Sequence, residues 1–331
     1  MLEVRRRGLT TLLGGTAVGW ALAAHAQVPE KIPRLCFLTF DPGTLTSNRF
    51  GAFFEGLRDL GYANGQTISI DYLSVEGNGE RFPALAEECL RLKADIIAVS
   101  TTPGAQAAIA ATRTIPIIMI GLGDPVRTGL VGNLARPSGN ITGLSLMVPE
   151  VATKRLGLLK DAIPGISQVL VLSYLADPIA PLQVKAMQEA AQPLGLTLQV
   201  HDIRTANDLP AAFDAAAREH AEALLTTSES IFVAQGQRVT ELAARYKLPA
   251  MYCFSNDVVD FGGLMAYDVN YSRVIRRAAS YVDRILKGAK VSDLPIEQPI
   301  KFEFSINLKA AKALGLTIPP GVLAIADKVI E

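Results

Sequence analysis

Three hydroxyl residues end one of the apolar runs of the chain, and their position suits the binding of an anion. Ser100, Thr101 and Thr102 follow the run that starts at Ile96, and Pro103 comes directly after them. Proline is favoured in the first turn of a helix, so we expect a helix to begin here with free backbone N–H groups. Such N–H groups and hydroxyls bind a carboxylate, while the same hydroxyls also serve as ordinary helix caps. The two roles are compatible.

A carboxylate lies near the start of the glycine-rich stretch GLGDPVRTGLVGNLARPSGNITG, residues 121–143. Gly121 and Gly123 lack the third glycine of a dinucleotide fingerprint, and the chain has no phosphate loop of the GxxxxGK(S/T) type. Asp124 precedes Pro125, where it either pairs with the ammonium group of a ligand or forms an Asx turn that shapes the loop. We expect Asp124 to contact the ligand, with the glycines letting the backbone approach it closely.

Motifs for catalysis and for metal binding are missing. The segment GLSLM at residues 143–147 lacks the second glycine of a nucleophile elbow. His201 and His220, the histidines that follow residue 26, belong to no HExxH or Cys/His cluster. We therefore expect no enzyme activity, no catalytic residue, no metal and no cofactor. The alternative is an exported α/β enzyme of the racemase or hydrolase type.

The three cysteines do not suggest a disulfide framework. Cys36, Cys89 and Cys253 are odd in number, far apart and embedded in apolar segments. Exported disulfide-rich proteins have an even and dense set instead, so we expect three buried free thiols. A two-thiol racemase would use Cys36 with Cys253, but Cys36 falls inside a predicted strand, where its side chain points into the packing.

The elements that must position these residues alternate in type, as in α/β proteins with parallel sheets. The first half predicts strands at 35–40, 67–73, 96–100 and 116–120, and helices at 47–60, 81–92 and 104–112. The second half predicts strands at 168–172, 197–203, 223–226 and 250–253, and helices at 181–194, 209–220 and 231–246. We expect an α/β fold of two Rossmann-like lobes with parallel sheets.

The two halves are similar in order as well as in type. AVSTTPGAQAAIAATRTIPIIMI and LLTTSESIFVAQGQRVTELAARYKLPAMYC both run from a strand through hydroxyls and a helix to an aliphatic residue, proline and a strand. We interpret them as two copies of one lobe, the alternative being the general likeness of any two βα units. The tail predicts strands at 263–267 and 301–304 and helices at 271–287 and 308–314, enough chain to cross between the lobes more than once and form a hinge.

These patterns divide the chain into three parts. Residues 1–26 are expected to be a signal peptide, residues 27–144 plus 266–298 the N-terminal lobe, and residues 145–265 plus 299–331 the C-terminal lobe. The first crossing between the lobes is expected at residues 140–144.

The amino terminus has the features of an export signal. Arg5, Arg6 and Arg7 precede an apolar run that ends at Ala24-His25-Ala26, which predicts cleavage before Gln27 and a periplasmic location. A membrane anchor is the alternative, but the run is shorter than a spanning helix needs. The route, general or twin-arginine, stays open. Removal of the arginines leaves a slight acidic excess, which gives no basic surface for nucleic acid.

The ligand of an open parallel sheet lies beyond the carboxyl ends of its strands. Those loops carry hydroxyls, a few carboxylates and scattered aromatic residues, which suit holding a small polar molecule. We expect ligand contacts from Thr39, Phe40, Ser100, Thr101, Thr102, Gly121, Asp124, Ser173, Tyr174, Asp177, Ser228, Glu229, Phe254, Asn256, Tyr267 and Asp268.

Two long motifs carry a family resemblance. GLGDPVRTGLVGNLARPSGNITGLS and YVDRILKGAKVSDLPIEQPIKFEFSINLKAAKALGLTIPP, with the closing ADKVIE, are similar to the ABC-transporter solute-binding proteins that include the tryptophan- and tyrosine-associated uptake proteins. The resemblance covers essentially the whole chain after the signal peptide. It implies a type I periplasmic binding protein with a three-segment hinge that closes on its ligand and delivers it to a membrane permease and its ATPase.

The resemblance also implies a solute class and particular residues. An amino acid or a related aromatic or carboxylate compound is the expected solute, and the protein is expected to be a monomer. The family's Asp-Pro-Val motif matches Asp124, Pro125 and Val126, and its hydroxyl-rich turn matches residues 100–102. A departure is AYDVNY, where Asp268 replaces the usual glycine and adds a carboxylate near the predicted hinge. A small-molecule-sensing regulator on the same fold is an alternative, but the signal peptide occupies the place of its DNA-binding motif.

Overall fold

The computed structural model describes residues 31–40 and 48–331. The signal peptide predicted at residues 1–26 lies outside these ranges. Residues 32–331 form one compact unit that contains two sheets. Within the described ranges, no helix is both long and apolar enough to cross a membrane.

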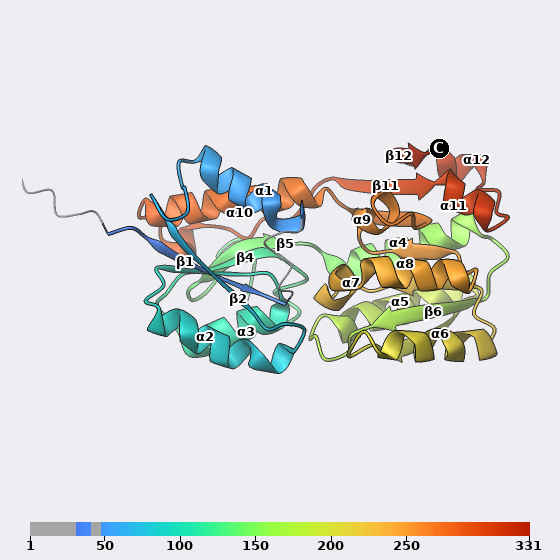
Figure 1. Ribbon diagram of the computed structural model, residues 1–331, viewed down its shortest axis with the longest axis horizontal. Coiled ribbons are helices and arrows are strands. Elements are labelled where there is room, and N and C mark those ends of the chain that lie inside the picture. The colour runs from blue at the N-terminus through green and yellow to red at the C-terminus, as the bar shows by residue number, and fades with distance from the viewer. Residues whose placement is uncertain (1–30, 41–47) are drawn as a thin grey trace, which may run out of the picture. The chain divides into compact units, whose positions relative to one another are not determined.

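The first sheet has five parallel strands in the order β2-β1-β3-β4-β5. Alternate residues of its strands face opposite sides, and each side is covered by two helices (Figure 1). Helices α1 and α10 pack on one face, and α2 and α3 pack on the other. The elements are β1 (Arg34–Thr39), α1 (Asn48–Asp59), β2 (Ser69–Ser74), α2 (Phe82–Arg91), β3 (Ile96–Val99), α3 (Thr102–Ala111), β4 (Ile117–Leu122), β5 (Ile141–Ser145) and α10 (Tyr271–Leu286).

The second sheet has seven strands in the order β12-β11-β10-β9-β8-β6-β7. It is parallel except between β10 and β11, which run antiparallel. Its elements are α4 (Val148–Ala162), β6 (Gln168–Ser173), α5 (Ala180–Leu194), β7 (Thr197–Asp202), α6 (Asp208–Arg218), β8 (Ala223–Thr226), α7 (Ser230–Ala234), α8 (Gly236–Arg245), β9 (Ala250–Tyr252), α9 (Ser255–Val259), β10 (Met265–Val269), β11 (Phe302–Asn307), α11 (Leu308–Ala313), α12 (Pro320–Leu323) and β12 (Lys328–Ile330).

The strand order confirms the internal repeat. The first four strands of the chain lie in the order β2-β1-β3-β4, and the next four sheet strands after β5 lie in the equivalent order β7-β6-β8-β9. In each lobe the first strand of the repeat therefore lies between the second and the third, and the carboxyl ends of these parallel strands lie at the same edge of the sheet. The predicted α/β fold with two parallel-sheet lobes is correct.

Four departures from the predicted elements affect the region between the lobes and the sheets beside it. The predicted helix 231–246 is two helices, α7 and α8, which meet at Gln235. Residues 140–144, expected to form the first crossing, belong mostly to β5, where the φ of +131° at Gly143 and the backbone of Met119 against it leave no room for a side chain. Helix α4 was not predicted. Strand β10 belongs to the second sheet, so the chain returns to the first lobe at Asn270, later than residue 266.

Three short segments connect the lobes. They are residues 146–147 between β5 and α4, residue Asn270 between β10 and α10, and residues 297–301 before β11. The first and third run beside each other, because Ser145 N donates to Glu297 O (2.9 Å) and Glu297 N donates to Gly143 O (3.1 Å). Met147 has a φ of +53°, an unusual conformation for a residue with a side chain, and it turns the chain into α4.

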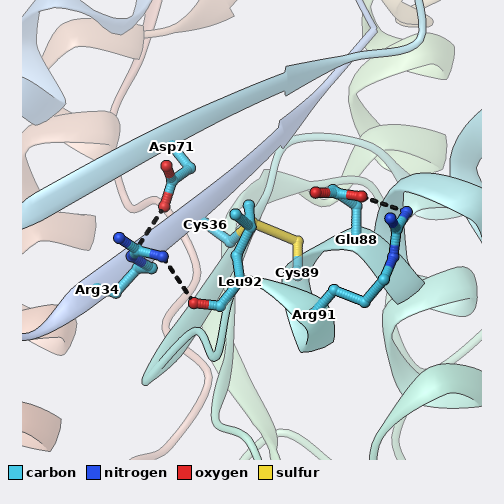
Figure 2. Close-up of a disulfide and its surroundings, with 7 residues drawn as sticks. All are labelled: Arg34, Cys36, Asp71, Glu88, Cys89, Arg91 and Leu92. Carbon is cyan, nitrogen blue, oxygen red and sulfur yellow. Dashed lines mark hydrogen bonds and ion pairs between the residues drawn. A yellow bond between two sulfur atoms is a disulfide. The ribbon is translucent and has the colours of Figure 1, made fainter.

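A disulfide joins Cys36 to Cys89, so the prediction of three free thiols is wrong for these two (Figure 2). Cys36 lies on the face of β1 that α2 covers, and Cys89 lies on the buried side of α2, with their Cα atoms 5.8 Å apart. The bond closes a loop of 53 residues, which stabilises the fold by about 4 kcal/mol on the loop-entropy model. Cys253 is free and buried, as predicted.

Candidate functional site

The carboxyl ends of the two sheets face each other across a narrow cleft. The cavity between them is small, about 30 Å³, and both lobes line it. A second cavity of about 10 Å³ adjoins it at Thr101, Asp177 and Ser230. We call the two together the cleft cavity. The main part is lined by Ser100, Thr101, Thr102, Gly121, Leu122, Gly123, Leu146, Val148, Asp177, Ile179, Ser228, Glu229, Ser230, Phe254 and Tyr271.

The lobes touch across this cleft. The rings of Phe40 and Tyr174 lie 6.1 Å apart between centroids. Ile179 of the second lobe packs against Gly123 of the first so closely that a Cβ on Gly123 would lie 2.5 Å from Ile179 Cγ1. A cavity of about 360 Å³ opens at the rim, between residues 76–78 of the first lobe and residues 204–206 of the second, but the contacts narrow the cleft cavity itself to room for about one or two water molecules. A ligand therefore enters only when the lobes move apart.

The first lobe offers hydroxyls at a helix terminus. The Thr101 side chain caps α3 by accepting a hydrogen bond from Gly104 N (3.1 Å), and the Ser100 hydroxyl donates to Leu38 O (3.3 Å). Both residues still line the cleft cavity, so these hydrogen bonds leave them at its wall. The amino end of the ten-residue α3 directs a partial positive charge at this cavity, although Pro103 has no N–H and the N–H groups of Gly104 and Ala105 are already bonded to Thr101.

The second lobe offers two carboxyl groups. Asp177 and Glu229 are 6% and 2% exposed, and no ion pair within the described residues involves either of them. Burial raises the pKa of Glu229 to about 8, and the neighbouring charge of Asp177 adds to this rise. Burial also raises the pKa of Asp177 to about 6. Both carboxyls therefore hold their protons more tightly than usual while the cleft is empty, and a bound cation would stabilise their ionised forms.

Polar groups hold Glu229 in place. Its carboxyl accepts hydrogen bonds from Gln183 Nε2, from the Thr227 hydroxyl and from Tyr174 N. Gln183 is fully buried, and its Oε1 in turn accepts from the Ser228 hydroxyl (3.0 Å). The carboxyl group is thus fixed by a network, although all of its partners are neutral.

A buried arginine anchors that network to the sheet. Arg155 of α4 donates from Nη1 to the Ser228 hydroxyl (3.1 Å), from Nη2 to Cys253 O (3.0 Å) and from Nε to Tyr267 O (2.7 Å). Its Nη2 also lies 4.0 Å from Asp268 Oδ1. Arg155 thereby joins the carboxyl ends of β9 and β10 to the loop that carries Ser228, which fixes the geometry of this half of the cleft.

Aromatic rings complete the lining. Phe254 and Tyr271 meet edge to face, with centroids 6.3 Å apart and planes at 87°. Phe40 and Tyr174 lie at the adjoining part of the cavity, and burial together with the charge of Asp177 raises the pKa of Tyr174. These rings are suited to contact with an apolar or aromatic part of a ligand.

Eleven of the sixteen predicted residues lie at the cleft cavity or directly behind it, and the other five do not line it. The cleft cavity contacts Phe40, Ser100, Thr101, Thr102, Gly121, Tyr174, Asp177, Ser228, Glu229 and Phe254 directly, and Asp268 lies behind it against Arg155. Thr39 and Ser173 are buried at the ends of β1 and β6. Within the described ranges, Ser173 Oγ has no hydrogen-bond partner.

Asp124, the ligand contact expected from the glycine-rich stretch, does not line the cleft cavity. Its Oδ1 accepts hydrogen bonds from Val126 N (3.1 Å) and Arg127 N (2.9 Å), and its Oδ2 lies 3.4 Å from Arg127 Nε. This is the Asx turn that was the alternative interpretation. Gly121 and Gly123 contact the cavity instead, through the backbone at the end of β4.

Two further predicted residues point away from the cleft. Asn256 donates to Asp260 Oδ2 (2.6 Å) on the exposed side of α9. Tyr267 stacks on Phe302 of β11, with centroids 5.6 Å apart and planes at 14°. Because β10 pairs with β11, the side chain of Tyr267 belongs to a face of the second sheet and not to its edge.

Sequence reasoning missed several residues of the site. Ile179 and Tyr271 line it, while Gln183 and Arg155 support it. Tyr271 starts α10 directly after Asn270, whose side chain accepts from Arg273 N, so the capping signal at Asn270 would have placed it at a crossing. The others had no local signal, because only the packing of α4 and α5 brings them to the cleft. Among residues 31–40 and 48–331, no cluster of three or more metal-ligating side chains occurs.

Comparison with known proteins places the chain in one family. A family model described as ABC transporter substrate binding protein matches residues 43–330. A tyrosine-binding protein of Clostridioides difficile (strain R20291) is 27% identical over 264 residues, which cover 80% of this chain and 75% of that protein.

Two solved structures give the same result. An ABC domain from Streptococcus pneumonia in complex with L-Trp is 25% identical, has a TM-score of 0.81, and is matched over 90% of this chain and 99% of that one. The ligand-free, open structure of a substrate binding protein with adhesive properties from Clostridium difficile is also 25% identical over 90% and 99%, with a TM-score of 0.61. With the family model spanning most of its length, the chain belongs to the ABC transporter substrate binding protein family.

Proposed function

We propose that this protein captures an aromatic amino acid in the cleft cavity by closing its two lobes, and passes it to a membrane permease. The proposal rests on one observation: the two lobes present different chemical groups to the two sides of the cleft. Asp177 and Glu229 offer two carboxyl groups to a cation on one side, and the amino end of α3 with its hydroxyls offers a site for an anion on the other. An amino acid presents an ammonium and a carboxylate that match these two sides.

Hinge closure is the second part of the proposal. At equal identity and coverage, the TM-score is 0.81 against the complex with L-Trp and 0.61 against the ligand-free, open structure. The contact of Ile179 with Gly123 and that of Phe40 with Tyr174 agree with a closed arrangement. A ligand that touches both lobes stabilises this form relative to the open one, which is the energetic basis of capture.

The aromatic class is supported by the relatives and by the lining. One relative is a tyrosine-binding protein, and a related structure holds L-Trp. Phe254, Tyr271, Phe40 and Tyr174 supply ring faces and edges on the cavity wall. Asp268, the departure from the family pattern, pairs with Arg155 behind the cavity, so its carboxylate leaves the aromatic preference intact.

A panel of ligands tests the two sides of the cleft separately, because some of the ligands lack the ammonium and others lack the carboxylate. Thermal-shift and calorimetric titrations would compare L-tryptophan, L-tyrosine and L-phenylalanine with indole-3-propionate, which lacks the ammonium, and tryptamine, which lacks the carboxylate. A chain that begins at Gln27 contains no tryptophan, so fluorescence of bound L-tryptophan has no protein background. We expect the amino acids to bind and both truncated compounds to bind weakly. A panel in which no amino acid raises the melting temperature would contradict the proposal.

We also propose that the protein is not an enzyme. Cys36 is held in the disulfide, and burial raises the pKa of the Cys253 thiol well above its ordinary value, which keeps it protonated and unreactive. A two-thiol racemase therefore has no reactive pair here. Turnover of either enantiomer of a bound amino acid, lost in the Cys253→Ala variant, would refute this.

Location and partners follow from the family. We propose a periplasmic receptor, exported with cleavage before Gln27, that acts as a monomer with an ABC permease and its ATPase and without nucleic acid. The disulfide agrees with an oxidising compartment outside the cytoplasm. Amino-terminal sequencing of the exported protein and its sedimentation behaviour test the cleavage and the monomer.

A further inference from the structure

A second, larger cavity lies on the first lobe beside the segments that connect the lobes. Its volume is about 690 Å³, which is within the range of small-molecule sites. Helices α1 and α10, which run side by side, form its sides (Figure 1). Residues of α1, of the end of β5, of α10 and of the segment 297–301 line it, among them Asp59, Leu144, Arg273, Arg277 and Lys301. We call it the hinge cavity.

The hinge cavity has an excess of positive charge. Arg276 pairs with Glu55 (3.4 Å) and Asp59, and Arg277 makes a bidentate pair with Glu297 (2.9 and 2.7 Å). These arginines are therefore neutralised. Arg273 and Lys301 also line the cavity, and no carboxylate of the described residues forms an ion pair with either. Two cations thus remain to attract an anion.

The rest of the wall is mostly apolar. Leu60, Leu144, Val274 and Pro299 contribute to it, and Ile300 is 94% exposed beside Lys301. Ile300 therefore extends the apolar part of the wall next to the cation of Lys301. Cations next to apolar walls fit a molecule with an acidic head and an apolar body.

Two of the three connecting segments line the hinge cavity, and the end of β5, which leads into the first segment, lines it as well. Leu144 and Ser145 come from the end of β5, Asn270 is the second crossing, and residues 297–301 are the third. Any change in the angle between the lobes alters these segments and hence the shape of the cavity. A molecule that fits one shape better than the other shifts the balance between open and closed forms, and the shift is reciprocal with binding in the cleft.

We propose that the hinge cavity binds a small organic anion with an apolar body, held by Arg273 and Lys301, and that its occupancy changes the affinity of the cleft for its solute. The coupling, but not the binding itself, rests on the proposed function. The site is separate from the cleft cavity, since the two share no lining residue.

The probe for the test is 8-anilino-1-naphthalenesulfonate, an apolar fluorescent monoanion. We expect saturable binding at one site in the wild-type protein, and affinity about tenfold lower in the double variant Arg273→Ala/Lys301→Ala, since two charge contacts are lost. The matched control is Lys185→Ala/Arg218→Ala, which removes two exposed cations from the second lobe and leaves the affinity unchanged. Ile300→Glu adds a negative charge at the mouth and is expected to weaken binding further.

Equal probe affinity in the wild-type protein and in Arg273→Ala/Lys301→Ala would overturn the binding site, whatever the cleft binds. Simple competition between the probe and L-tryptophan would also overturn it, because it would place the probe in the cleft. If the probe binds as expected, L-tryptophan is titrated with and without saturating probe. A changed dissociation constant supports the coupling, and an unchanged one refutes it. If L-tryptophan does not bind at all, the proposed function fails while the site stands.

Discussion

The two lobes share a strand order but meet the cleft with different chemistry. The first lobe presents neutral groups: glycine backbone at 121–123, hydroxyls at 100–102 and the amino end of α3. The second presents two buried carboxyl groups: Glu229 is held by Gln183 and, through Ser228, by Arg155, and Asp177 accepts a hydrogen bond from Ile179 N. The same fold, repeated twice, therefore forms a site whose two sides differ. The first lobe allows the second to approach closely, and the second lobe supplies the carboxyl groups.

The lobes also differ in how they are stabilised. The disulfide between Cys36 and Cys89 fastens β1 to α2 in the first lobe, whereas Cys253 of the second lobe is a free thiol next to the contacts of Arg155. The first lobe thus depends on a covalent bond, and the second depends on a buried polar network. Each change described below removes or alters one of these features in one lobe.

The largest effect is expected from loss of the disulfide. Cys36→Ser/Cys89→Ser should lower the free energy of unfolding by about 4 kcal/mol, because the unfolded chain regains the entropy of a 53-residue loop. Urea unfolding measures this, and reductant should destabilise the wild type but not the variant. Cys253→Ser is the control for a cysteine outside the bond. A wild type that is equally stable with and without reductant would contradict the prediction.

Next in size is removal of charge from the second lobe. Glu229→Gln or Asp177→Asn should weaken binding of the amino acid about hundredfold, because the buried partner of the ammonium is lost. The empty protein should not lose stability, since Gln keeps the shape and ends the repulsion between the two carboxyls. Calorimetry measures the affinity, with Glu189→Gln on the exposed side of α5 as the matched control. Unchanged affinity would remove the carboxyls from the site.

Close approach of the lobes is tested at Gly123. Gly123→Val places a side chain where Ile179 packs, which should weaken binding by about 2 kcal/mol, or about thirtyfold, by opposing closure. Gly132→Val, in the same loop with open space around it, is the control. The double variant Gly123→Val/Ile179→Ala should recover much of the affinity. If Gly132→Val weakens binding as much as Gly123→Val, the loop rather than the contact is responsible.

The raised pKa values predict opposite pH trends for binding and stability. Binding of an ammonium needs ionised carboxyls, so affinity should rise about tenfold between pH 6 and pH 7, below the pKa of about 8 of Glu229. Stability of the empty protein should fall from about pH 4.5 to pH 8, because the folded state retains protons that the unfolded state has already lost. Calorimetry and thermal unfolding across this range measure both. In Glu229→Gln both slopes should flatten, and unchanged slopes would assign the titration elsewhere.

The smallest effect on binding is expected at Asp124. Asp124→Ala should change affinity less than about threefold, because the side chain caps a turn outside the cleft cavity. It should cost about 1 kcal/mol of stability through the lost backbone hydrogen bonds. Parallel measurement of affinity and unfolding separates the two. A large loss of affinity at unchanged stability would restore Asp124 as a ligand contact.

Local patterns were enough to predict much of the fold. Alternating apolar runs and helical periods gave the repeat, and the hydroxyl and carboxyl loops at strand ends gave most of the cleft lining. Features that depend on contact between distant segments were out of reach. Cys36 and Cys89 are 53 residues apart and meet only because α2 packs on β1. Tyr267 leaves the cleft because β11, far along the chain, pairs with its strand.

The position of α4 illustrates the same limit. Its start depends on the left-handed turn at Met147, which no residue preference announces. With α4 unpredicted, Arg155 could not be assigned to the base of the site. The role of the Asp124 side chain was open for a different reason. An Asp-Pro pair fits both a ligand contact and an Asx turn. Only the positions of Arg127 and of the backbone show which of the two the side chain forms.

The anchoring of Ser228 by Arg155 has a kinetic consequence. The half of the cleft that holds the two carboxyl groups is assembled within the second lobe alone. A solute can therefore bind there before the first lobe closes over it. Association would then proceed in two steps, with a fast encounter on the second lobe followed by a slower closure that sets the residence time. The permease would then control transport mainly through the rate at which the solute is released, and less through the rate at which it is captured.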